Sequence, residues 1–575
     1  MNNQWKQSMA ALMIGALAVQ GSLGLPVVHG EETAAQIQPA SEGASYYLTN
    51  TIQAAVKSAS VQSTANGIRI AATVRLYNGG TAKARIPDFE LRVRTADGVE
   101  YKLDASADNK TALKPLEVAE LVFMSVIDSK DKTPVKITRL AFVNVDEYAY
   151  PKIETELLSM PLDRKVWYDA ESTEPLSAVR LAWGQTFSLA GVNSNLLYTP
   201  VGYSKQHTDQ GAAVLVTVVV ENPGEGRETV PDFRMDARSD IKKYAGKRTE
   251  ETAPQLDPGE KTYIHFAIPV ENNDEPAKLQ VMTTDPFKSG NDSLPLDTGK
   301  AVIALPEGGL ADPAAMSAYT LGTPISVDPL SQLIDQTDIS LMELHLQQNP
   351  ADGYQTAIAK FKLTNKSGKP IPTPAFDTEL RSPSGSAYAG VRQTNVPAAL
   401  NPGLGYTLSY AFNLPQSETG EGLVLKLLDA KSAAPYKVAI ASVPAPVQKE
   451  TATDVLHLFP LDIKLEHWEF GTNYLSTNAT YSYKLKLTLD ITQQPDVVVD
   501  QNFPTLRFEA VDKLGRVLST ADAGLTGTQK LISGTQTIVT GTVQSEQFEF
   551  PITVNVYEVV DTPSGQAKRF LTTLD

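Results

Sequence analysis

A short set of residues recurs three times along this chain at almost fixed spacing, and the repetition limits the fold more than any other feature. Each copy contains an Asn, a Phe 11 residues later, a Leu that begins a Leu-x-Pro turn, and an aromatic residue ten positions after that Leu. The copies are Asn78, Phe89, Leu113, Phe123; Asn222, Phe233, Leu256, Phe266; and Asn365, Phe376, Leu400, Tyr410. Spacing this regular indicates internal duplication of one structural unit.

Each recurring residue has a physical interpretation. The runs before the Asn, at 70–78, 214–222 and 357–365, largely alternate apolar and polar residues, which is the period of a strand with one buried face. The Asn, with Gly79, Gly224 or Gly368 close behind it, predicts a turn that uses a positive φ. A Pro before the Phe suits a strand start, and the Phe is expected to fill the core.

Short strands separated by turns predict an all-β protein of four tandem immunoglobulin-like antiparallel β-sandwich domains. A fourth, degenerate copy lacks the turn Asn and has Leu506 where the Phe is expected. The predicted repeats, called repeats 1 to 4 below, span 45–160, 176–305, 324–445 and 459–575.

The first 30 residues resemble a secretory signal peptide, with an apolar run at 9–19 and a cleavage site before Glu31. The alternative is a retained membrane anchor, but Gln20, Gly21, Ser22 and Pro26 interrupt the apolar stretch before it reaches the ~20 residues of a comfortable span. We expect removal of the signal, a flexible leader at 31–44 and no membrane span in the mature chain. The predicted location is secreted or associated with the cell surface.

Composition excludes several classes of protein. The chain has no Cys, so an exported protein of this kind must be stabilised by packed cores and not by disulfides. Its formal charge of -16 disfavours nucleic acid as a partner, since an acidic surface repels the phosphate backbone.

The strand–Asn–Gly turn, the Pro-Asp-Phe strand start and the Leu-x-Pro-Gly-Glu turn resemble the immunoglobulin-like extracellular repeats of uncharacterised secreted proteins from Gram-positive bacteria. The resemblance covers most of the chain. It implies an adhesive, spacer or polymer-associated role in the cell envelope and carries no assigned chemistry.

No arrangement of residues predicts catalysis. The sequence has no His-Glu-x-x-His, Gly-x-Ser-x-Gly or phosphate-binding Gly-rich motif. His265 precedes the core-facing Phe266, so alternation predicts a solvated strand residue. His457 and His467 flank the last junction and are interpreted as surface or interdomain residues. We expect no catalytic residue, no cofactor and no metal.

Two weaker candidates for binding remain. Asp128, Asp131, Asp274 and Glu275 lie in equivalent turns and supply oxygens of the kind that Ca²⁺ prefers, but they lack the regular spacing of a defined calcium loop. Tyr148 and Tyr150 stand two apart and would share one face if their segment is extended, which predicts a ligand platform together with Trp468.

The sequence therefore predicts a non-catalytic structural or interaction protein that presents tandem modules to a cell-envelope polymer or a protein partner. The alternative is an array of polysaccharide-binding modules. An enzyme with an unrecognised site is a third hypothesis.

Overall fold

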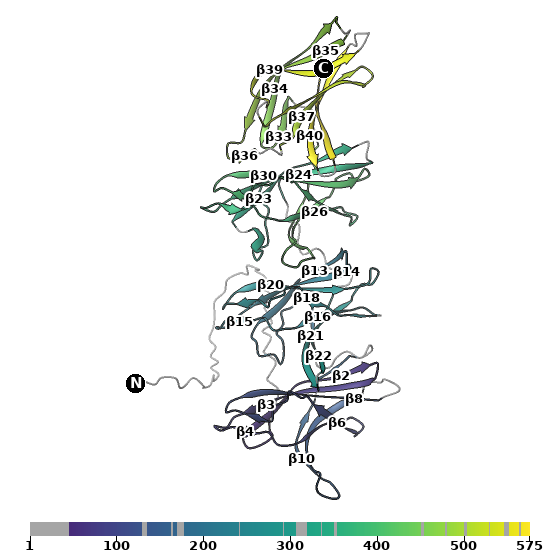
Figure 1. Cartoon of the computed structure of the whole chain (residues 1–575), viewed down its shortest axis with the longest axis vertical. Coiled ribbons are helices and arrows are strands. Elements are labelled where there is room, and N and C mark those ends of the chain that lie inside the picture. The colour runs from purple at the N-terminus through teal and green to yellow at the C-terminus, as the bar shows by residue number, and fades with distance from the viewer. Residues whose placement is uncertain are drawn as a thin grey trace, which may run out of the picture. The chain divides into compact units, whose positions relative to one another are not determined.

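We describe the chain from a computed structural model (Figure 1). The structure describes residues 45–128, 135–162, 165–169, 178–240, 242–290, 292–305, 319–334, 336–349, 353–449, 454–477, 480–499, 503–527, 530–544, 551–562 and 565–575. The predicted signal and leader lie outside these residues. Apart from the 3-10 helix η1 (Gln332–Ile334), the regular structure of the described residues is strand.

Repeat 1 contains the first ten strands, and β11 follows in the connector. The strands are β1 (Tyr46–Tyr47), β2 (Ile52–Thr64), β3 (Gly67–Asn78), β4 (Ala84–Arg85), β5 (Glu90–Thr95), β6 (Glu100–Ala105), β7 (Ala112–Leu113), β8 (Val118–Ile127), β9 (Ile137–Asp146), β10 (Ile153–Pro161) and β11 (Val166–Tyr168). The main sheet runs β1-β2-β3-β8-β6-β5-β9-β10, while β11 pairs with β2 in parallel and β4 pairs with β7.

Repeat 2 contains two larger sheets, ordered β12-β22-β21-β16-β17 and β13-β14-β20-β18, and the small pair β15-β19. The strands are β12 (Val179–Ala182), β13 (Leu197–Thr208), β14 (Gly211–Glu221), β15 (Glu228–Thr229), β16 (Arg234–Arg238), β17 (Lys243–Tyr244), β18 (Lys247–Arg248), β19 (Gln255–Leu256), β20 (Lys261–Pro269), β21 (Lys278–Ser289) and β22 (Asp292–Ala304).

Repeats 3 and 4 share a mixed sheet, ordered β28-β30-β24-β23-β41-β40-β37-β38, with β36 paired to β30 in parallel. Repeat 3 contains β23 (Thr337–Asn349), β24 (Tyr354–Asn365), β25 (Ile371–Pro372), β26 (Asp377–Arg381), β27 (Ala387–Ala389), β28 (Val391–Arg392), β29 (Ala399–Leu400), β30 (Gly405–Pro415), β31 (Val424–Asp429) and β32 (Val438–Pro444). The other sheets of repeat 3 are β27-β26-β31-β32 and β25-β29.

Repeat 4 and the junction before it supply the remaining strands. They are β33 (Val455–Leu458), β34 (Leu461–Leu475), β35 (Thr480–Gln493), β36 (Val497–Val498), β37 (Thr505–Asp512), β38 (Val517–Gly524), β39 (Gly534–Gln544), β40 (Ile552–Thr562) and β41 (Gly565–Leu574). The second sheet of this repeat is β33-β34-β35-β39.

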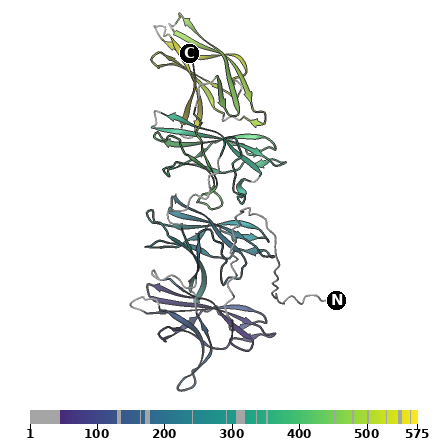
Figure 2. The same ribbon diagram turned by 180° about the vertical axis from the view of Figure 1, so that it is seen from behind.

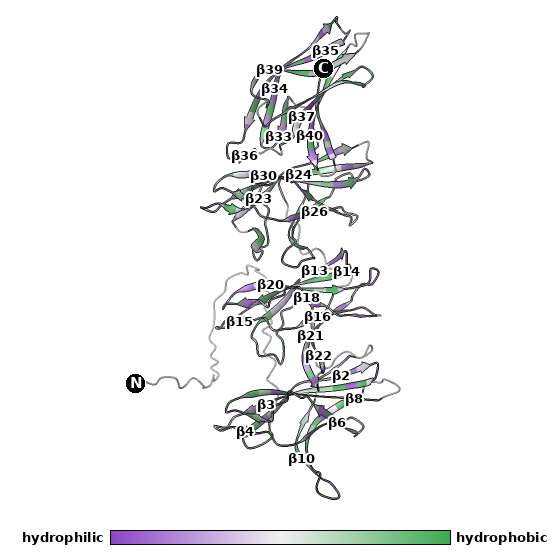
Figure 3. Cartoon of the chain, viewed as in Figure 1, coloured by the Kyte–Doolittle hydropathy of each residue, from purple (hydrophilic) through white to green (hydrophobic). Residues whose placement is uncertain are grey.

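The described residues form one large apolar cluster in each repeat. Each cluster takes side chains from the first long hairpin of the repeat and from its last strands. In repeat 2, for example, Val216 of β14 and Val281 of β21 belong to the same cluster. The alternation of polar and apolar residues along the strands is visible in Figure 3. The architecture is therefore all-β and sandwich-like, as the sequence predicted.

The recurring Phe residues contact these cores. Phe233 and Phe376 are buried, and the half-buried Phe89 packs against the first core. The ring of Phe233 lies 5.0 Å from that of Phe266, centroid to centroid, so two of the recurring aromatics contact each other directly. Aromatic pairs at this distance stabilise a core beyond their buried area.

The recurring Asn acts differently from the prediction. Asn222 is fully buried, and its side-chain Nδ2 donates to the carbonyls of Gly226, at 2.8 Å, and Leu256, at 3.0 Å. Its Oδ1 accepts from the backbone N–H of Gly224 at 3.0 Å. Gly224 has no positive φ, so the predicted use of a left-handed glycine is wrong.

The same three kinds of hydrogen bond recur at Asn78 and Asn365. Neither Gly79 nor Gly368 has a positive φ. The Asn side chain replaces backbone partners in the turn, which is the behaviour of an Asx turn, and it ties that turn to the Leu-x-Pro segment.

The recurring positive φ occurs instead in the Leu-x-Pro turn that follows. Gly259 and Gly403, the glycines of the Leu-x-Pro-Gly turns, have φ of 76° and 72°. Repeat 1 has Leu116 at this place, with φ of 59°. Gly98 and Gly385, in the turns that follow β5 and β26, also have positive φ, at 80° and 90°.

A β-bulge common to all four repeats aligns the fourth copy with the first three. The first long hairpin of every repeat has one register shift, and the residues that pair immediately after it are Thr73, Thr217, Lys360 and Thr488. The first three stand five residues before the recurring Asn. By the same count, Gln493 occupies the Asn position in repeat 4. Within the described residues, no helix is both long and apolar enough to cross a membrane.

Candidate functional site at the contacts between repeats

The most distinctive polar features of the described structure are charged side chains at the contacts between successive repeats. Asp285 of β21 lies against repeat 1, where it pairs with Lys57 Nζ at 2.8 Å and accepts from Thr73 Oγ1 at 2.9 Å. Lys57 also pairs with Glu120 at 2.7 Å. Burial opposes the charge of Lys57, but the two carboxylates outweigh it and raise its pKa.

Lys300 of β22 is a second buried cation near this cluster. Burial is the main cause that lowers its pKa to about 8, and Lys57 adds to the effect, while Asp285 acts in the opposite direction. A lysine with a pKa of about 8 loses its proton at mildly alkaline pH, so the charge of the cluster changes there.

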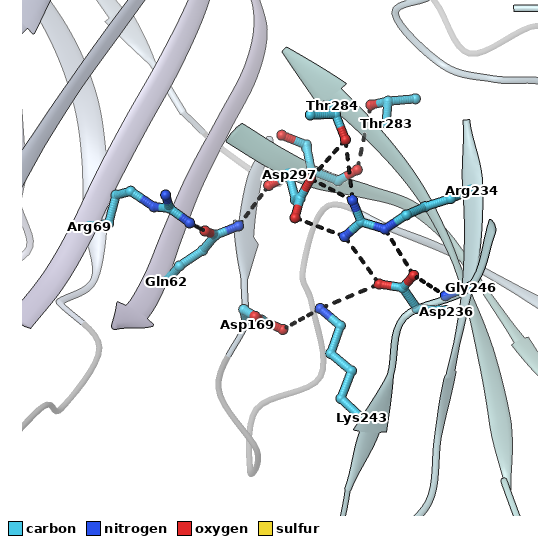
Figure 4. A network of polar contacts seen from close by, with 11 residues as sticks. Gln62, Arg69, Asp169, Arg234, Asp236, Lys243, Gly246, Thr283, Thr284 and Asp297 are labelled. Carbon is cyan, nitrogen blue, oxygen red and sulfur yellow. Dashed lines mark hydrogen bonds and ion pairs between the residues drawn. The ribbon is translucent and has the colours of Figure 1, made fainter. Parts of the chain in front are cut away.

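A second network joins the connector after repeat 1 to repeat 2 (Figure 4). Arg234 of β16 donates to both carboxylate oxygens of Asp297, each at 2.8 Å, and to the buried Asp236 at 2.9 Å. Lys243 pairs with Asp169 at 3.2 Å. Bidentate pairing of a planar guanidinium fixes geometry as well as charge, and it raises the pKa of Arg234.

Gln62 of β2 belongs to the same region and comes from repeat 1. Its Nε2 donates to the backbone carbonyl of Asp297 at 2.8 Å. Trp167 of β11 is fully buried beside Gly299, where an added Cβ would lie 2.1 Å from the ring. The connector strand β11 therefore packs so closely on repeat 2 that only glycine fits at 299.

The third contact, between repeats 3 and 4, contains a buried group of four charges. Lys360 of β24 pairs with Glu343 and with Glu558 of β40, each at 2.8 Å, and Glu558 also pairs with Arg569 at 2.6 Å. Burial disfavours the charge of Glu558, but Lys360 and Arg569 outweigh it and lower its pKa to about 2. The four side chains therefore form one paired group.

The first and third of these clusters pair charges of one repeat with charges of the next. Buried ion pairs are a weak source of net stability, but removing one partner is costly because it leaves an uncompensated buried charge. Their best-supported role is therefore to specify how one repeat docks on the next.

The structure separates the three residues of the predicted ligand platform. Tyr148 and Tyr150 lie in the connection between β9 and β10 of repeat 1, and both are fully exposed. Residues 147–150 form a turn and bends, so the extended conformation that would align the two rings is not present. Trp468 belongs to β34 of repeat 4 and packs, half-buried, against the fourth core.

The calcium candidates have other partners where they are described. Asp274 accepts from Tyr244 Oη and from Ser239 Oγ at 2.7 Å, and these two hydrogen bonds lower its pKa. Glu275 pairs with Lys205 at 2.8 Å. Asp128 is exposed, and Asp131 lies outside the described residues. Calcium binding at these turns stays an untested alternative to the prediction of no metal.

The structure shows the surroundings of His265 and His457. His265 faces away from the core, as alternation predicts, but it is buried and not solvated. Its ring Nδ1 forms a hydrogen bond of 2.8 Å with Oε1 of Glu250. His457 is an exposed residue that pairs with Asp462 at 2.7 Å, in agreement with a surface position.

Repeat 3 also has a groove of about 620 Å³. Its lining includes Tyr319, His345, Glu421 and Lys449 together with backbone and apolar side chains. Few polar groups converge on it, so the groove does not define a ligand chemistry.

Sequence reasoning missed the charged contacts between repeats. Lys57, Asp285, Lys360 and Glu558 stand in strands whose other face is apolar, so each reads as an ordinary solvated residue. Only the packing of one repeat on another buries them. The alternation of β24, with Lys360 at a position that is Thr in repeats 1 and 2, was the one available signal.

Comparisons with known proteins add little. No family model matches the chain, and no curated protein matches it. Among solved structures, one similar chain is a protein of unknown function from Porphyromonas gingivalis W83, with 15% sequence identity and a TM-score of 0.13. The match covers 44% of this chain and 99% of that one. A similarity this low supports no functional argument.

Proposed function

We propose that this chain is a secreted or cell-surface, non-catalytic structural protein made of four tandem immunoglobulin-like domains, which presents its modules to a polymer or protein of the cell envelope. The observation that carries the proposal is the pairing of buried charges across successive repeats. Such contacts hold modules in defined positions.

Recurrence supports the same role. The residues that recur, exemplified by Asn222, Phe233 and Leu256, are buried in turns and cores and are unavailable to a partner. Recognition must then lie in features that do not recur. The resemblance to extracellular repeats of secreted Gram-positive proteins, which are commonly adhesive or polymer-associated, agrees with this assignment.

Cosedimentation with isolated cell envelopes tests the proposal. Purified residues 31–575 should sediment with envelopes from a Gram-positive bacterium in a saturable manner. Binding that disappears after protease treatment of the envelopes identifies a protein partner, and binding that disappears after extraction of the wall polysaccharide identifies a polymer. Absence of binding to any envelope fraction would contradict the proposal.

A polysaccharide-binding module array is the second candidate, and the full exposure of Tyr148 and Tyr150 favours it. Exposed aromatic rings stack on sugar rings. A glycan array should then show saturable binding that Tyr148→Ala with Tyr150→Ala removes. Tyr47→Ala, which alters another exposed tyrosine of repeat 1, is the matched control. Binding that survives the double substitution would exclude this platform.

A further inference from the structure

The last hairpin of repeat 2 docks on the preceding repeat. Phe287 of β21 and Leu296 of β22, each 3% exposed, form an apolar cluster with Ala71 of β3 and Met124 of β8. Asp285 anchors the same hairpin through its bonds to Lys57 and Thr73. Strand β22 contacts β2 of repeat 1 and lies beside it in Figure 1, and Figure 2 shows the same ribbon from behind.

Repeat 3 contacts repeat 2 in the same way. Ala433, in the connection between β31 and β32, is fully buried and clusters with Leu215 of β14. Beside it, the backbone of Lys437 exchanges two hydrogen bonds with Gln206 of β13, at 2.6 Å and 3.0 Å. Again the last hairpin of one repeat covers the outer face of the first sheet of the repeat before it.

The docked residues are equivalent by strand register. The strands that follow the recurring Phe begin at Glu90, Arg234 and Asp377, and their ladder partners are Val143, Met282 and Leu428. Five residues further along stand Tyr148, Phe287 and Ala433. Phe287 and Ala433 are the docked residues of their hairpins, so Tyr148 occupies the docking position of repeat 1.

The hairpin of repeat 1 carries the other docking groups as well. Asp146 is three residues beyond Val143, as Asp285 is beyond Met282. Ile153 pairs with Asp146 across the hairpin as Leu296 pairs with Asp285. Tyr148 is fully exposed and Ile153 is 59% exposed. Repeat 1 thus presents a docking hairpin, defined by Asp146, Tyr148 and Ile153, whose two apolar residues are exposed.

The accepting face is also equivalent from repeat to repeat. The position five residues before the recurring Asn is Thr73 in repeat 1 and Lys360 in repeat 3, and each binds a carboxylate from the last hairpin of the next repeat. Two residues earlier, Ala71 and Leu215 supply the apolar contact.

In repeat 4 the accepting face lies on β34, β35 and β39. Lys486 occupies the position of Ala71 and Leu215 and is exposed, and Thr488 occupies that of Thr73. Lys484 is exposed beside them, and its ladder partner Val539 is 57% exposed.

From this continuity we infer that the docking hairpin of repeat 1 binds the accepting face of repeat 4 in a second copy of the chain. The two surfaces are complementary in charge. The hairpin offers the carboxylates of Asp146 and Glu147, with Lys152 at 3.4 Å from Glu147 offsetting part of that negative charge. The face offers Lys484 and Lys486, with Glu469 at 3.8 Å from Lys486 offsetting part of that positive charge. Because donor and acceptor are different surfaces, the contact is heterologous and generates chains or closed rings of copies.

Sedimentation of residues 31–575 over a wide range of concentration tests the inference. We expect the weight-average mass to rise with concentration above that of a single chain. The double variant Tyr148→Ala with Ile153→Ala should weaken association by roughly 100-fold, since two buried apolar side chains contribute about 3 kcal/mol. Val99→Ala, at another exposed apolar residue of repeat 1, should leave association unchanged.

Directed cross-linking identifies the surfaces, because the chain has no Cys of its own. Tyr150→Cys mixed with Lys486→Cys should form an intermolecular disulfide faster than either variant alone. Val99→Cys mixed with Lys486→Cys is the control.

A chain that stays at single-chain mass, or a mixture that cross-links no faster than the control, overturns the inference. So does association that the double variant leaves intact. The result is independent of envelope binding, so failure of one proposal does not entail failure of the other.

Discussion

Replacement of the buried Asn222 by Ala should destabilise repeat 2 strongly. The side chain donates two hydrogen bonds to backbone carbonyls and accepts one from Gly224. Each is worth about 1 kcal/mol net, and stranding the buried partners adds to the loss, so we expect about 3 kcal/mol or more. The turn at 222–226 and the segment around Leu256 should both loosen.

Hydrogen exchange of the full chain, followed by mass spectrometry, measures this effect locally. Multidomain unfolding is not two-state, so a local probe is preferable to one global transition. Peptides that cover β14 and β20 should exchange faster in Asn222→Ala, while those of repeat 4 should not change. Asn78→Ala should have the same effect on repeat 1 only, and Asn66→Ala, at an exposed turn, serves as the control.

Asn222→Asp separates the donated bonds from the accepted one. It keeps an acceptor for Gly224 but directs a carboxylate at the carbonyl oxygens of Gly226 and Leu256, which should raise its pKa in the folded state. The folded state then holds the proton more tightly than the unfolded state, so stability falls as pH rises from about 4. If Asn222→Ala changes local protection by less than about 0.5 kcal/mol, or if the Asp variant shows no such pH dependence, the hydrogen-bonding account is wrong.

Three further predictions concern single positions. Leu116→Gly should stabilise repeat 1 by about 1 kcal/mol in thermal unfolding, because it relieves a φ of 59°, and a loss of stability would contradict this. Gly299→Ala should destabilise the β11 contact by about 1–3 kcal/mol or more, seen as faster exchange of β11, since its Cβ would overlap the ring of Trp167. Gly368→Ala, in open space and likewise without a positive φ, is the matched control. The pKa of Glu558 is lowered from 4.5 to about 2, so the stability from its pairing is complete above pH 4.5 and is lost as pH falls through 2. Chemical denaturation at a series of pH values should show a loss of about 3 kcal/mol over this range. Glu558→Gln should remove this pH dependence.

The sequence by itself determined the local structure of this protein. The largely alternating run at 357–365 was enough to predict a strand, because side chains of a strand point to opposite faces whatever its neighbours are. The Phe positions followed from the same period. The role of Asn222 was misjudged, since Asn suits both a left-handed residue and an Asx turn, and only its buried carbonyl partners distinguish the two.

Tertiary structure decided which polar residues matter. Lys360 and Glu558 are far apart in sequence, and only the packing of repeat 4 on repeat 3 makes them a buried pair. Likewise, the sequence alone does not distinguish Tyr148 from the other tyrosines. Only the ladder register aligns it with the docked Phe287. Local sequence dictates strands and turns through short-range sterics and hydrogen bonds, whereas contacts between repeats depend on which surfaces meet, and no local pattern encodes that.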